Sequence, residues 1–187
     1  MRFSALLLAL MPLAACVAPT PPNPPTASDL PITPARGVRI TDGADIRIAA
    51  GGDVRCAPTS PAEIAVAISA TNAFRRSKGL PPVVSDPAAQ RAAEGHACEM
   101  ASRGTMTHYG ETGPMGRLKK AGFKNPAMVA ENVAAGMMSD QVVLATWAAS
   151  PKHGANMSYP EATHFGYAKI HDGRQGFWVA LHAARRR

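Results

Sequence analysis

Residues 165–181 read FGYAKIHDGRQGFWVAL, and this stretch decides the fold class. The two ends, 165–170 and 177–181, are short runs rich in aromatic and β-branched residues, which favour strands. The segment between them, 172–176, has the aspartate and glycine content of a hairpin connection. The chain is therefore predicted to end in a β-hairpin.

Helical signals precede this hairpin. Residues 60–63 (SPAE) form a capping box with proline at the first helical position, and Gly79 ends the helix that they open. Three further helices are expected over residues 86–104, 114–121 and 139–150. Helices that come first and strands that come late indicate an α+β fold, in which helices cover a small antiparallel sheet.

Composition sets the limits for the whole chain. Its 187 residues are 46% hydrophobic and 18% charged, which excludes a fully disordered protein. The length suits one globular domain with an appendage. The three cysteines are too few for a disulfide-dominated scaffold or a four-thiolate metal site.

The N-terminus is predicted to be a lipoprotein signal peptide over residues 1–15. Arg2 precedes an apolar run that is too short to span a bilayer, and residues 13–16 (LAAC) resemble a bacterial lipobox. Cys16 would then be lipid-modified and become the first residue of the mature chain, while ordinary cleavage after Ala15 is the alternative. Val17 is not the aspartate of an inner-membrane retention signal, so we expect anchoring in the outer membrane, facing the periplasm.

The segments after the anchor differ in composition. Residues 16–36 are proline-rich and are predicted to form an extended linker. Residues 37–59 are expected to be an irregular or hairpin lead-in, with a turn at Asp42 and Gly43. The domain proper is placed at residues 60–184, and a basic tail at 185–187.

The candidate functional residues are three polar side chains within short motifs. His108 lies in TMTHYG, Glu131 in AENVA, and His153 in the segment WAASPKHGAN. Their order, together with the Asn72 and Arg75 helix motif and the closing FWVALHA, resembles the bacterial branch of the CAP superfamily. This superfamily of SCP-like domains is named for cysteine-rich secretory proteins, antigen 5 and pathogenesis-related proteins, and the resemblance covers about residues 62–183.

The resemblance implies an α-β-α sandwich with a cleft lined by histidine and glutamate. His108, Glu131 and His153 correspond to the cleft residues, and the expected neighbours of the cleft are Asn132, Ser150 and Asn156. The chain departs from the family pattern at residues 130 and 154, which are alanine and glycine in place of the usual glycine and arginine. It also lacks the HxTQ segment of animal and plant members, and His164 is not assigned to that role.

The chemistry of such a cleft leaves alternatives open. Two imidazoles and a carboxylate can bind Zn²⁺ and leave a position for water, which suits either binding or metal-assisted hydrolysis. Without a metal, Glu131 is a candidate general base, and Ser150 is either a nucleophile activated by His153 or a helix cap. No cofactor is therefore certain. The candidate functions are non-enzymatic binding of a lipid or cell-wall component, an envelope hydrolase of peptide or cell-wall bonds, and a passive structural lipoprotein.

The remaining features have simpler interpretations. Cys56 and Cys98 are expected to form a disulfide in an oxidising compartment, or else to be two buried thiols. His96 is expected to be a packed residue, and Trp147 and Trp178 core residues. Basic residues form patches that suit a solvated face, anionic lipid or cell-wall polymer: Arg117, Lys119, Lys120, Lys124 and 185–187. Nucleic acid is not an expected partner because no binding motif accompanies the charge, and the chain is expected to be a monomer.

Overall fold

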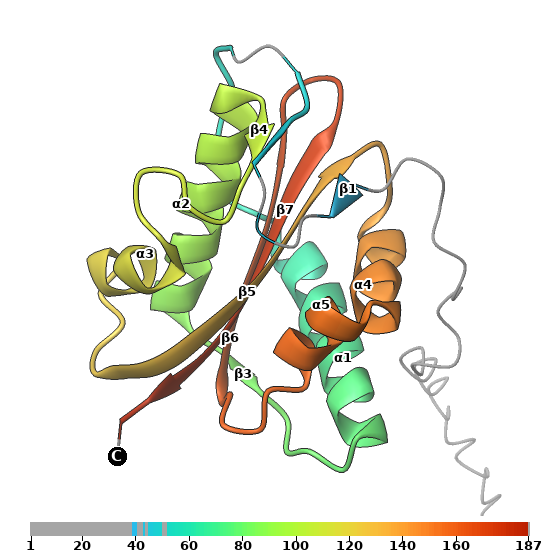
Figure 1. Ribbon diagram of the computed structural model, residues 1–187, viewed down its shortest axis with the longest axis vertical. Helices are drawn as coiled ribbons and strands as arrows, with labels where there is room; N and C mark the ends of the chain where they lie inside the picture. The colour runs from blue at the N-terminus through green and yellow to red at the C-terminus, as the bar shows by residue number, and fades with distance from the viewer. Residues whose placement is uncertain (1–38, 41–42, 44, 50–51, 187) are drawn as a thin grey trace, which may run out of the picture.

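A computed structural model describes residues 39–40, 43, 45–49 and 52–186 (Figure 1). The predicted signal peptide, Cys16 and the linker over 16–36 lie outside these residues. Within the described part of the chain, no helix is long and apolar enough to cross a membrane.

Three of the helices begin at the capping residues that the sequence predicts. Ser60 and Glu63 form the expected capping box, and the side chains of Asp86 and Ser139 cap two later helices. One helix was not among the four expected, and it lies in the SPKHGAN segment, residues 150–156. This helix has proline at its first position. The helices are α1 (Pro61–Ser77), α2 (Pro87–Arg103), α3 (Pro114–Lys120), α4 (Asp140–Ala149) and α5 (Pro151–Met157).

A five-stranded sheet forms the centre of the domain. Its order is β1-β5-β7-β6-β3, with β3 parallel to β6 and every other pair antiparallel. The predicted hairpin is confirmed as β6 (His164–His171) and β7 (Gly176–Arg185). The other strands are β1 (Arg39–Ile40), β3 (Val84–Ser85) and β5 (Pro126–Gly136).

Of the two alternatives for the lead-in over residues 37–59, irregular or hairpin, the hairpin is wrong, because its two short strands do not pair with each other. β1 pairs with β5, whereas β2 (Ile46–Arg47) pairs with β4 (Thr105–Met106) in a separate two-stranded sheet. The two short strands of the lead-in therefore join different sheets, because each finds a partner far away in sequence rather than the other. Strand β5 was also not predicted, although it pairs along its length with β7.

Two layers of helices enclose the five-stranded sheet. Helices α2 and α3 cover one face, and α1, α4 and α5 cover the other (Figure 1). Because successive residues of a strand point to opposite faces, Phe177, Val179 and Leu181 of β7 pack toward α2, while Trp178 and Ala180 pack toward α1 and α4. The predicted α-β-α sandwich is confirmed, and Trp147 and Trp178 are core residues.

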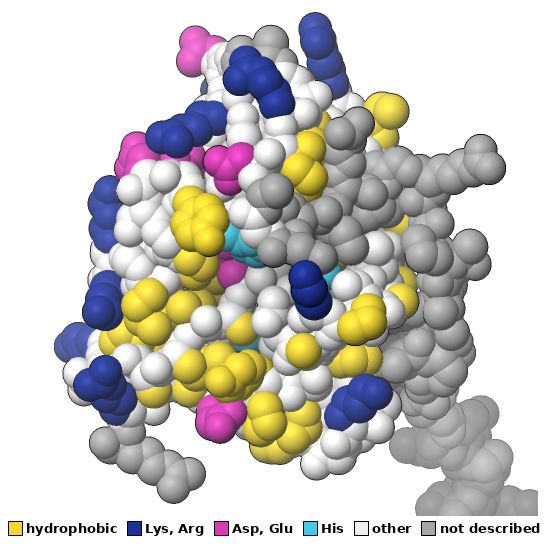
Figure 2. All heavy atoms as spheres, in the orientation of Figure 1, with side chains coloured by type: hydrophobic (Ala, Val, Ile, Leu, Met, Phe, Trp, Pro, Cys, Tyr) yellow, Lys and Arg dark blue, Asp and Glu magenta, His cyan; other side chains and the backbone are white. Residues whose placement is uncertain are grey.

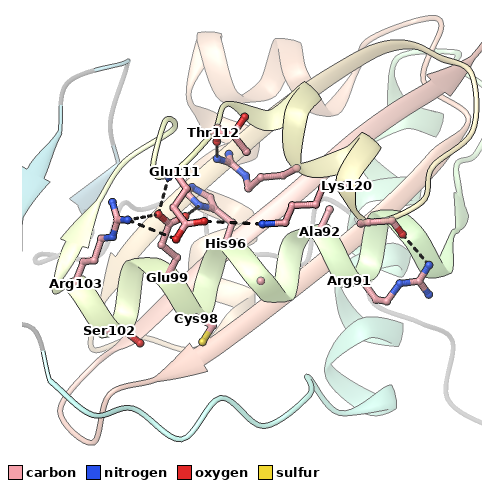
Figure 3. A pocket seen from close by; sticks show the side chains of 13 residues that line it. Arg91, Ala92, His96, Cys98, Glu99, Ser102, Arg103, Glu111, Thr112 and Lys120 are labelled. Carbon is pink, nitrogen blue, oxygen red and sulfur yellow. Dashed lines mark hydrogen bonds and ion pairs between the residues drawn. The ribbon is translucent and has the colours of Figure 1, made fainter.

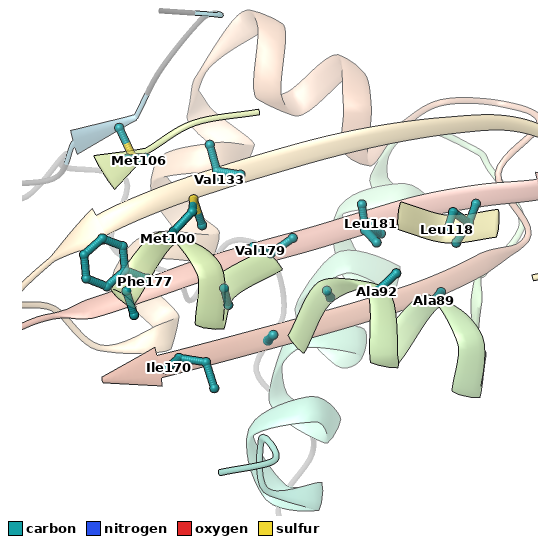
Figure 4. Packing of buried hydrophobic residues seen from close by; sticks show 14 of the residues in the cluster. Ala89, Ala92, Met100, Met106, Leu118, Val133, Ile170, Phe177, Val179 and Leu181 are labelled. Carbon is teal, nitrogen blue, oxygen red and sulfur yellow. The ribbon is translucent and has the colours of Figure 1, made fainter. Parts of the chain in front are cut away.

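Small side chains bring α2 close to the sheet. Ala89, Ala92 and Met100 of α2 lie over the sheet, in the same core cluster as Val179 of β7 (Figure 4). At the closest approach, a Cβ on Gly166 of β6 would collide with the backbone of Ala89. A glycine is therefore required at this position, because any larger residue would push α2 away from β6.

The predicted basic tail needs a correction. Arg185 is the last residue of β7, and its guanidinium donates to Asp86 at 2.6 Å while lying over the ring of Phe123. Its charge is therefore paired at the start of α2, and it is not part of a solvated tail.

Candidate functional site

Arg117 of α3 organises the loop that carries His108. The guanidinium donates to the backbone carbonyls of His108 and Tyr109 at 2.9 Å each, and also to the carbonyl of Thr112. Because guanidinium has several donors in one plane, a single side chain can hold three carbonyls of one loop. The prediction that Arg117 belongs to a surface basic patch is therefore wrong, since its side chain is only 8% exposed.

Glu131 is the acidic partner of this arginine. Its Oε2 accepts a hydrogen bond from Arg117 Nη2 at 2.7 Å, and its Oε1 lies 2.9 Å from His108 Nδ1. The Glu131 side chain is 1% exposed, whereas the His108 side chain is 19% exposed. We call Arg117, Glu131 and His108 the Glu131 cluster. Its ion pair, Arg117 with Glu131, is buried, and His108 reaches the surface.

His96 of α2 closes the buried side of the Glu131 cluster. Its Nε2 lies 2.7 Å from the carbonyl oxygen of Thr107 and 3.9 Å from Glu131 Oε1. A carbonyl oxygen can only accept, so Nε2 carries a hydrogen. Burial lowers the pKa of His96, the charge of Glu131 raises it, and the charge of Arg117 lowers it again. His96 is packed, as predicted, but it is packed against the site.

Glu99 fixes the far end of the same loop. One of its oxygens accepts from the backbone N–H of Glu111 at 2.7 Å, and the other lies 3.3 Å from His96 Nδ1. Gly110 has a positive φ of 56°, and a Cβ there would collide with the Glu99 carboxylate. Helix α2 therefore supplies two polar side chains that hold the His108 loop in one conformation.

His153 lies with a different set of residues. Successive residues of β5 point to opposite faces of the sheet, so Glu131 points toward α2 and Asn132 toward α5. There, Asn132 Nδ2 donates to the His153 carbonyl at 3.1 Å. Asn156 donates to the Asn132 side chain at 2.8 Å and to the Glu131 carbonyl at 3.1 Å. The sheet therefore separates the side chains of Glu131 and Asn132, and the two asparagines bind α5 to β5.

Ser150 precedes α5 and contacts His153. Its Oγ lies 2.8 Å from His153 Nδ1, and it makes no capping hydrogen bond to the backbone of α5. His153 is buried and Ser150 is half-buried. The residue occupies the N-cap position that the sequence predicts, but its hydroxyl pairs with the imidazole.

The predicted zinc set does not fit this geometry. Among the residues that the structure describes, no three His, Cys, Asp or Glu side chains are grouped so that they could hold a metal ion. His108 and Glu131 come together, but Arg117 already pairs with the carboxylate, and a guanidinium would oppose a second cation. His108, Glu131 and His153 therefore do not form a zinc site in this structure.

The functional residues that the sequence interpretation missed are Arg117, His96 and Glu99. A signal existed for His96 and Glu99, because residues at spacing three share one face of a helix. No local pattern distinguishes Arg117 from Lys119 and Lys120 beside it in a basic helix. Its burial depends on β5, which begins nine residues later in the sequence, after the end of α3 and a turn.

A disulfide holds the lead-in segment against α2. Cys56 and Cys98 are joined across 42 residues, with their Cα atoms 5.6 Å apart. Cys98 lies on α2, two residues after His96. The bond fastens the segment before α1 to the helix that carries the buried side of the Glu131 cluster.

The surface beside the Glu131 cluster is partly apolar. Tyr109, which follows His108, is 61% exposed. On the face shown in Figure 2, small areas of histidine and carboxylate surface are visible between apolar side chains, and basic side chains follow the edge where Figure 1 places α2 and α3. His108 and Tyr109 therefore bring the Glu131 cluster to a partly apolar surface.

Comparison with known proteins identifies the family. The model of the cysteine-rich secretory protein family, CAP, matches residues 68–181. The chain belongs to the CAP family. The Glu131 cluster and the asparagine contacts of α5 both lie within the matched segment of this CAP domain.

Bacterial proteins resemble this CAP domain in sequence and in structure. The uncharacterized protein YkwD of Bacillus subtilis is 27% identical over 108 residues, which cover 57% of this chain and 42% of YkwD. The chain thus spans less than half of that relative. The CAP domain shares the fold of three solved structures at 19–20% identity.

These structures differ in how much of them is matched. An outer surface protein of Borrelia burgdorferi has a TM-score of 0.63, with 72% of this chain and 99% of that chain covered. For an extracellular SCP-domain protein of Bacillus anthracis the TM-score is 0.61, with 69% and 45% covered. For a cysteine-rich secretory protein of Staphylococcus aureus it is 0.55, with 68% and 40% covered. This CAP domain is therefore of the bacterial type.

Proposed function

We propose that this chain is an envelope-anchored CAP-domain protein that acts by binding, through the surface formed by His108 and Tyr109. The observation that carries the proposal is the engagement of both Glu131 oxygens by Arg117 and His108. A general base must reach the proton that it removes. A substrate would have to displace a buried ion pair to reach this carboxylate, so Glu131 supports the loop rather than acting on a substrate.

The same geometry prepares the loop for binding. Arg117 holds its carbonyls and Glu99 holds its far end, so little conformational freedom is lost when a ligand contacts His108 or Tyr109. The proposed ligand is a lipid or a cell-wall component.

Co-sedimentation tests the binding surface. The purified Cys16→Ser chain, which has no acyl anchor, is mixed either with isolated peptidoglycan sacculi or with vesicles of phosphatidylethanolamine and phosphatidylglycerol. We expect it to sediment with one of them, and the double change His108→Ala and Tyr109→Ala to weaken this binding about tenfold. Tyr159→Ala is the matched control, because Tyr159 is an exposed tyrosine elsewhere on the domain. Binding to neither probe, or equal binding by the double variant, would contradict the proposal.

The anchor is a separate part of the proposal. Lipidation of Cys16 would tether the domain through the proline-rich linker to the outer membrane, facing the periplasm. The similarity to an outer surface protein of Borrelia burgdorferi and to an extracellular protein of Bacillus anthracis supports an address outside the cytoplasm. Labelled palmitate should be incorporated into the native chain and not into Cys16→Ser, and only the native chain should fractionate with membranes. A native chain without label would overturn the anchor and leave the binding surface unaffected.

A hydrolase is the second candidate function, and one contact favours it. Ser150 Oγ lies 2.8 Å from His153 Nδ1, a distance at which an imidazole can take the hydroxyl proton. This candidate predicts turnover of cell-wall peptide by the native chain that is lost in Ser150→Ala. Digestion of sacculi, followed by chromatography of the released fragments, decides between the two functions.

A further inference from the structure

Four exposed cations surround the turn between α3 and β5. Lys119 lies in the last turn of α3, and Lys124 comes two residues before the first residue of β5. Arg91 of α2 donates to the carbonyl of Ala121 at 2.8 Å, and the backbone N–H of Arg186, which follows β7, donates to this turn at 2.7 Å. We call Arg91, Lys119, Lys124 and Arg186 the basic surface.

These four charges are not compensated by acidic side chains in the part of the chain that the structure describes. Two neighbouring cations differ in this respect. Figure 3 shows that Lys120 turns toward Glu111, at 4.0 Å, and away from Arg91. Arg185 is paired with Asp86 at 2.6 Å. The basic surface is therefore the part of this edge that attracts an external anion.

The turn presents these charges from a fixed base. Phe123, in the turn, is 2% exposed and belongs to the core cluster on the α2 side of the sheet. The guanidinium of Arg185 lies over the Phe123 ring, 4.4 Å from its centre. Asn125 has a positive φ of 49°, a conformation that asparagine adopts more readily than most residues. Little backbone freedom is therefore lost when the cations contact a partner.

The basic surface lies at the far end of the sheet from the point where the N-terminal segment enters the domain. That segment reaches the sheet at β1, where Arg39 pairs with Ala135 near the end of β5. The basic surface surrounds the turn just before Pro126, the first residue of β5. From Pro126 to Ala135 is nine residues, which at about 3.3 Å each is a distance of about 30 Å. Figure 1 shows β1 and this turn at opposite ends of β5.

We propose that the basic surface docks on the carboxylates of peptidoglycan, the cell-wall polymer. The choice of this partner rests on the proposed anchor at Cys16, because the end of the domain that is remote from the tether faces the layer beyond the membrane. A polymer with repeated carboxylates engages several cations at once, so individually weak contacts add up. This contact is separate from the proposed binding through His108 and Tyr109, and it goes beyond that function.

Co-sedimentation of the purified Cys16→Ser chain with peptidoglycan sacculi tests the charge of the partner. Native sacculi are compared with sacculi whose carboxylates have been converted to amides, which are the same polymer without the charge. We expect binding to the amidated sacculi to be about fivefold weaker. Binding to native sacculi should fall by a similar factor in about 1 M salt, where charges are screened beyond about 3 Å. Equal binding to both kinds of sacculi, or binding to neither, would overturn the proposal.

A pair of lysine changes locates the contact. Lys119→Gln with Lys124→Gln removes two charges and should weaken binding to native sacculi about fourfold, without a change in Tm because both side chains are exposed. The matched control is Arg76→Gln with Lys78→Gln, which removes the same charge from exposed residues at the end of α1. We expect the control to bind like the parent chain. Equal weakening by both pairs would assign the effect to net charge and would overturn the proposal.

An anionic membrane is the alternative partner for these cations. The Cys16→Ser chain is therefore also mixed with vesicles of phosphatidylethanolamine and phosphatidylglycerol. We expect the lysine pair to contribute less to binding of the vesicles than to binding of the sacculi. If the vesicles are bound more tightly than the sacculi and this binding depends on Lys119 and Lys124, peptidoglycan is the wrong partner.

The double change His108→Ala and Tyr109→Ala separates this inference from the proposed function. If sacculus binding falls in that variant but is unchanged by the lysine pair, the basic surface is wrong and the proposed function stands. If it falls only with the lysine pair, the basic surface stands and the contact at His108 and Tyr109 is not the one that holds the sacculus.

Discussion

Arg75 and Arg117 are both buried and both hold backbone carbonyls, but only Arg117 also binds a carboxylate. Arg75 of α1 donates to four carbonyls at 2.9–3.0 Å, and the acceptors are Pro81, Met157, Tyr159 and Ala162. Arg117 donates to three carbonyls of the His108 loop and to Glu131. Each arginine shapes a loop, and they do so on opposite faces of the sheet.

Each arginine also has a buried histidine near it. His182, on the side of Arg75, has no hydrogen-bond partner for either ring nitrogen among the described residues. Burial lowers its pKa to about 3, and the charge of Arg75 contributes. His96, on the side of Arg117, contacts Thr107, Glu99 and Glu131 instead.

The difference separates a structural cluster from a site. The Arg75 side chain is fully buried and meets neutral carbonyls, so it has nothing to offer a ligand. The Glu131 cluster includes an acid, and it reaches the surface at His108 and the adjacent Tyr109. Burial of an arginine therefore does not distinguish the two clusters, whereas the surface residues His108 and Tyr109 do.

The largest expected effect is on the Arg75 side. Arg75→Ala would leave four buried carbonyls without donors, and we expect a loss of about 4 kcal/mol in the free energy of unfolding. Thermal melting should show a fall in Tm of about 10 °C or more. Arg76→Ala, an exposed neighbour on the same helix, is the control. Similar melting of the two variants would show that the carbonyl contacts are not structural.

Removal of Arg117 should cost less and should be partly reversible. Arg117→Met leaves Glu131 buried without its cation, and we expect a loss of about 3 kcal/mol, measured by denaturant unfolding at pH 7. Adding Glu131→Gln should recover part of this loss, because the buried charge is gone. Strictly additive effects in this double-mutant cycle would contradict a direct pair.

His182 should make the Arg75 side sensitive to acid. The unfolded residue has a pKa near 6.5, so between pH 6.5 and 3 the unfolded chain binds a proton that the folded chain does not. Stability contributed by the neutral ring is therefore lost as the pH falls, by about 2 kcal/mol between pH 7 and pH 5. His182→Leu should remove this part of the pH dependence. Unfolding at pH 8 controls for packing, and parallel pH profiles of the two proteins would refute the assignment.

The smallest expected effect is that of His108→Ala. Its side chain is partly exposed, and Arg117 still holds Glu131, so we expect a loss of less than about 1 kcal/mol in denaturant unfolding. His171→Ala, an exposed histidine at the end of β6, is the control. A loss as large as that of Arg117→Met would make His108 a structural residue and remove the distinction between the two clusters.

Much of the fold could be predicted because its signals are local. A capping box at Ser60, the cap at Asp86 and the hairpin residues act on backbone groups a few positions away. Strand β5 escaped prediction because Ala130, Ala134 and Ala135 have low strand preference and its two faces are both covered. Its partners come from β1 and β7, which are far away in sequence.

The candidate site was predictable only in part. His108 and Glu131 do meet, as the family resemblance implies. His153 does not join them as a metal ligand, because alternation along β5 directs Glu131 and Asn132 to opposite faces. A motif order along the chain cannot show this alternation unless the strand itself is recognised.

The sequence by itself determined where α1, α2, α3 and α4 start, the closing hairpin, the residues of the family motifs and the α+β class. Each of these depends on contacts between near neighbours or on residue identity. The tertiary structure alone decided that Arg117 is buried, that Glu131 pairs with it, and that His153 binds elsewhere. The physical reason is that a charge is buried only where a distant segment supplies its partner, and β5 supplies the partner here.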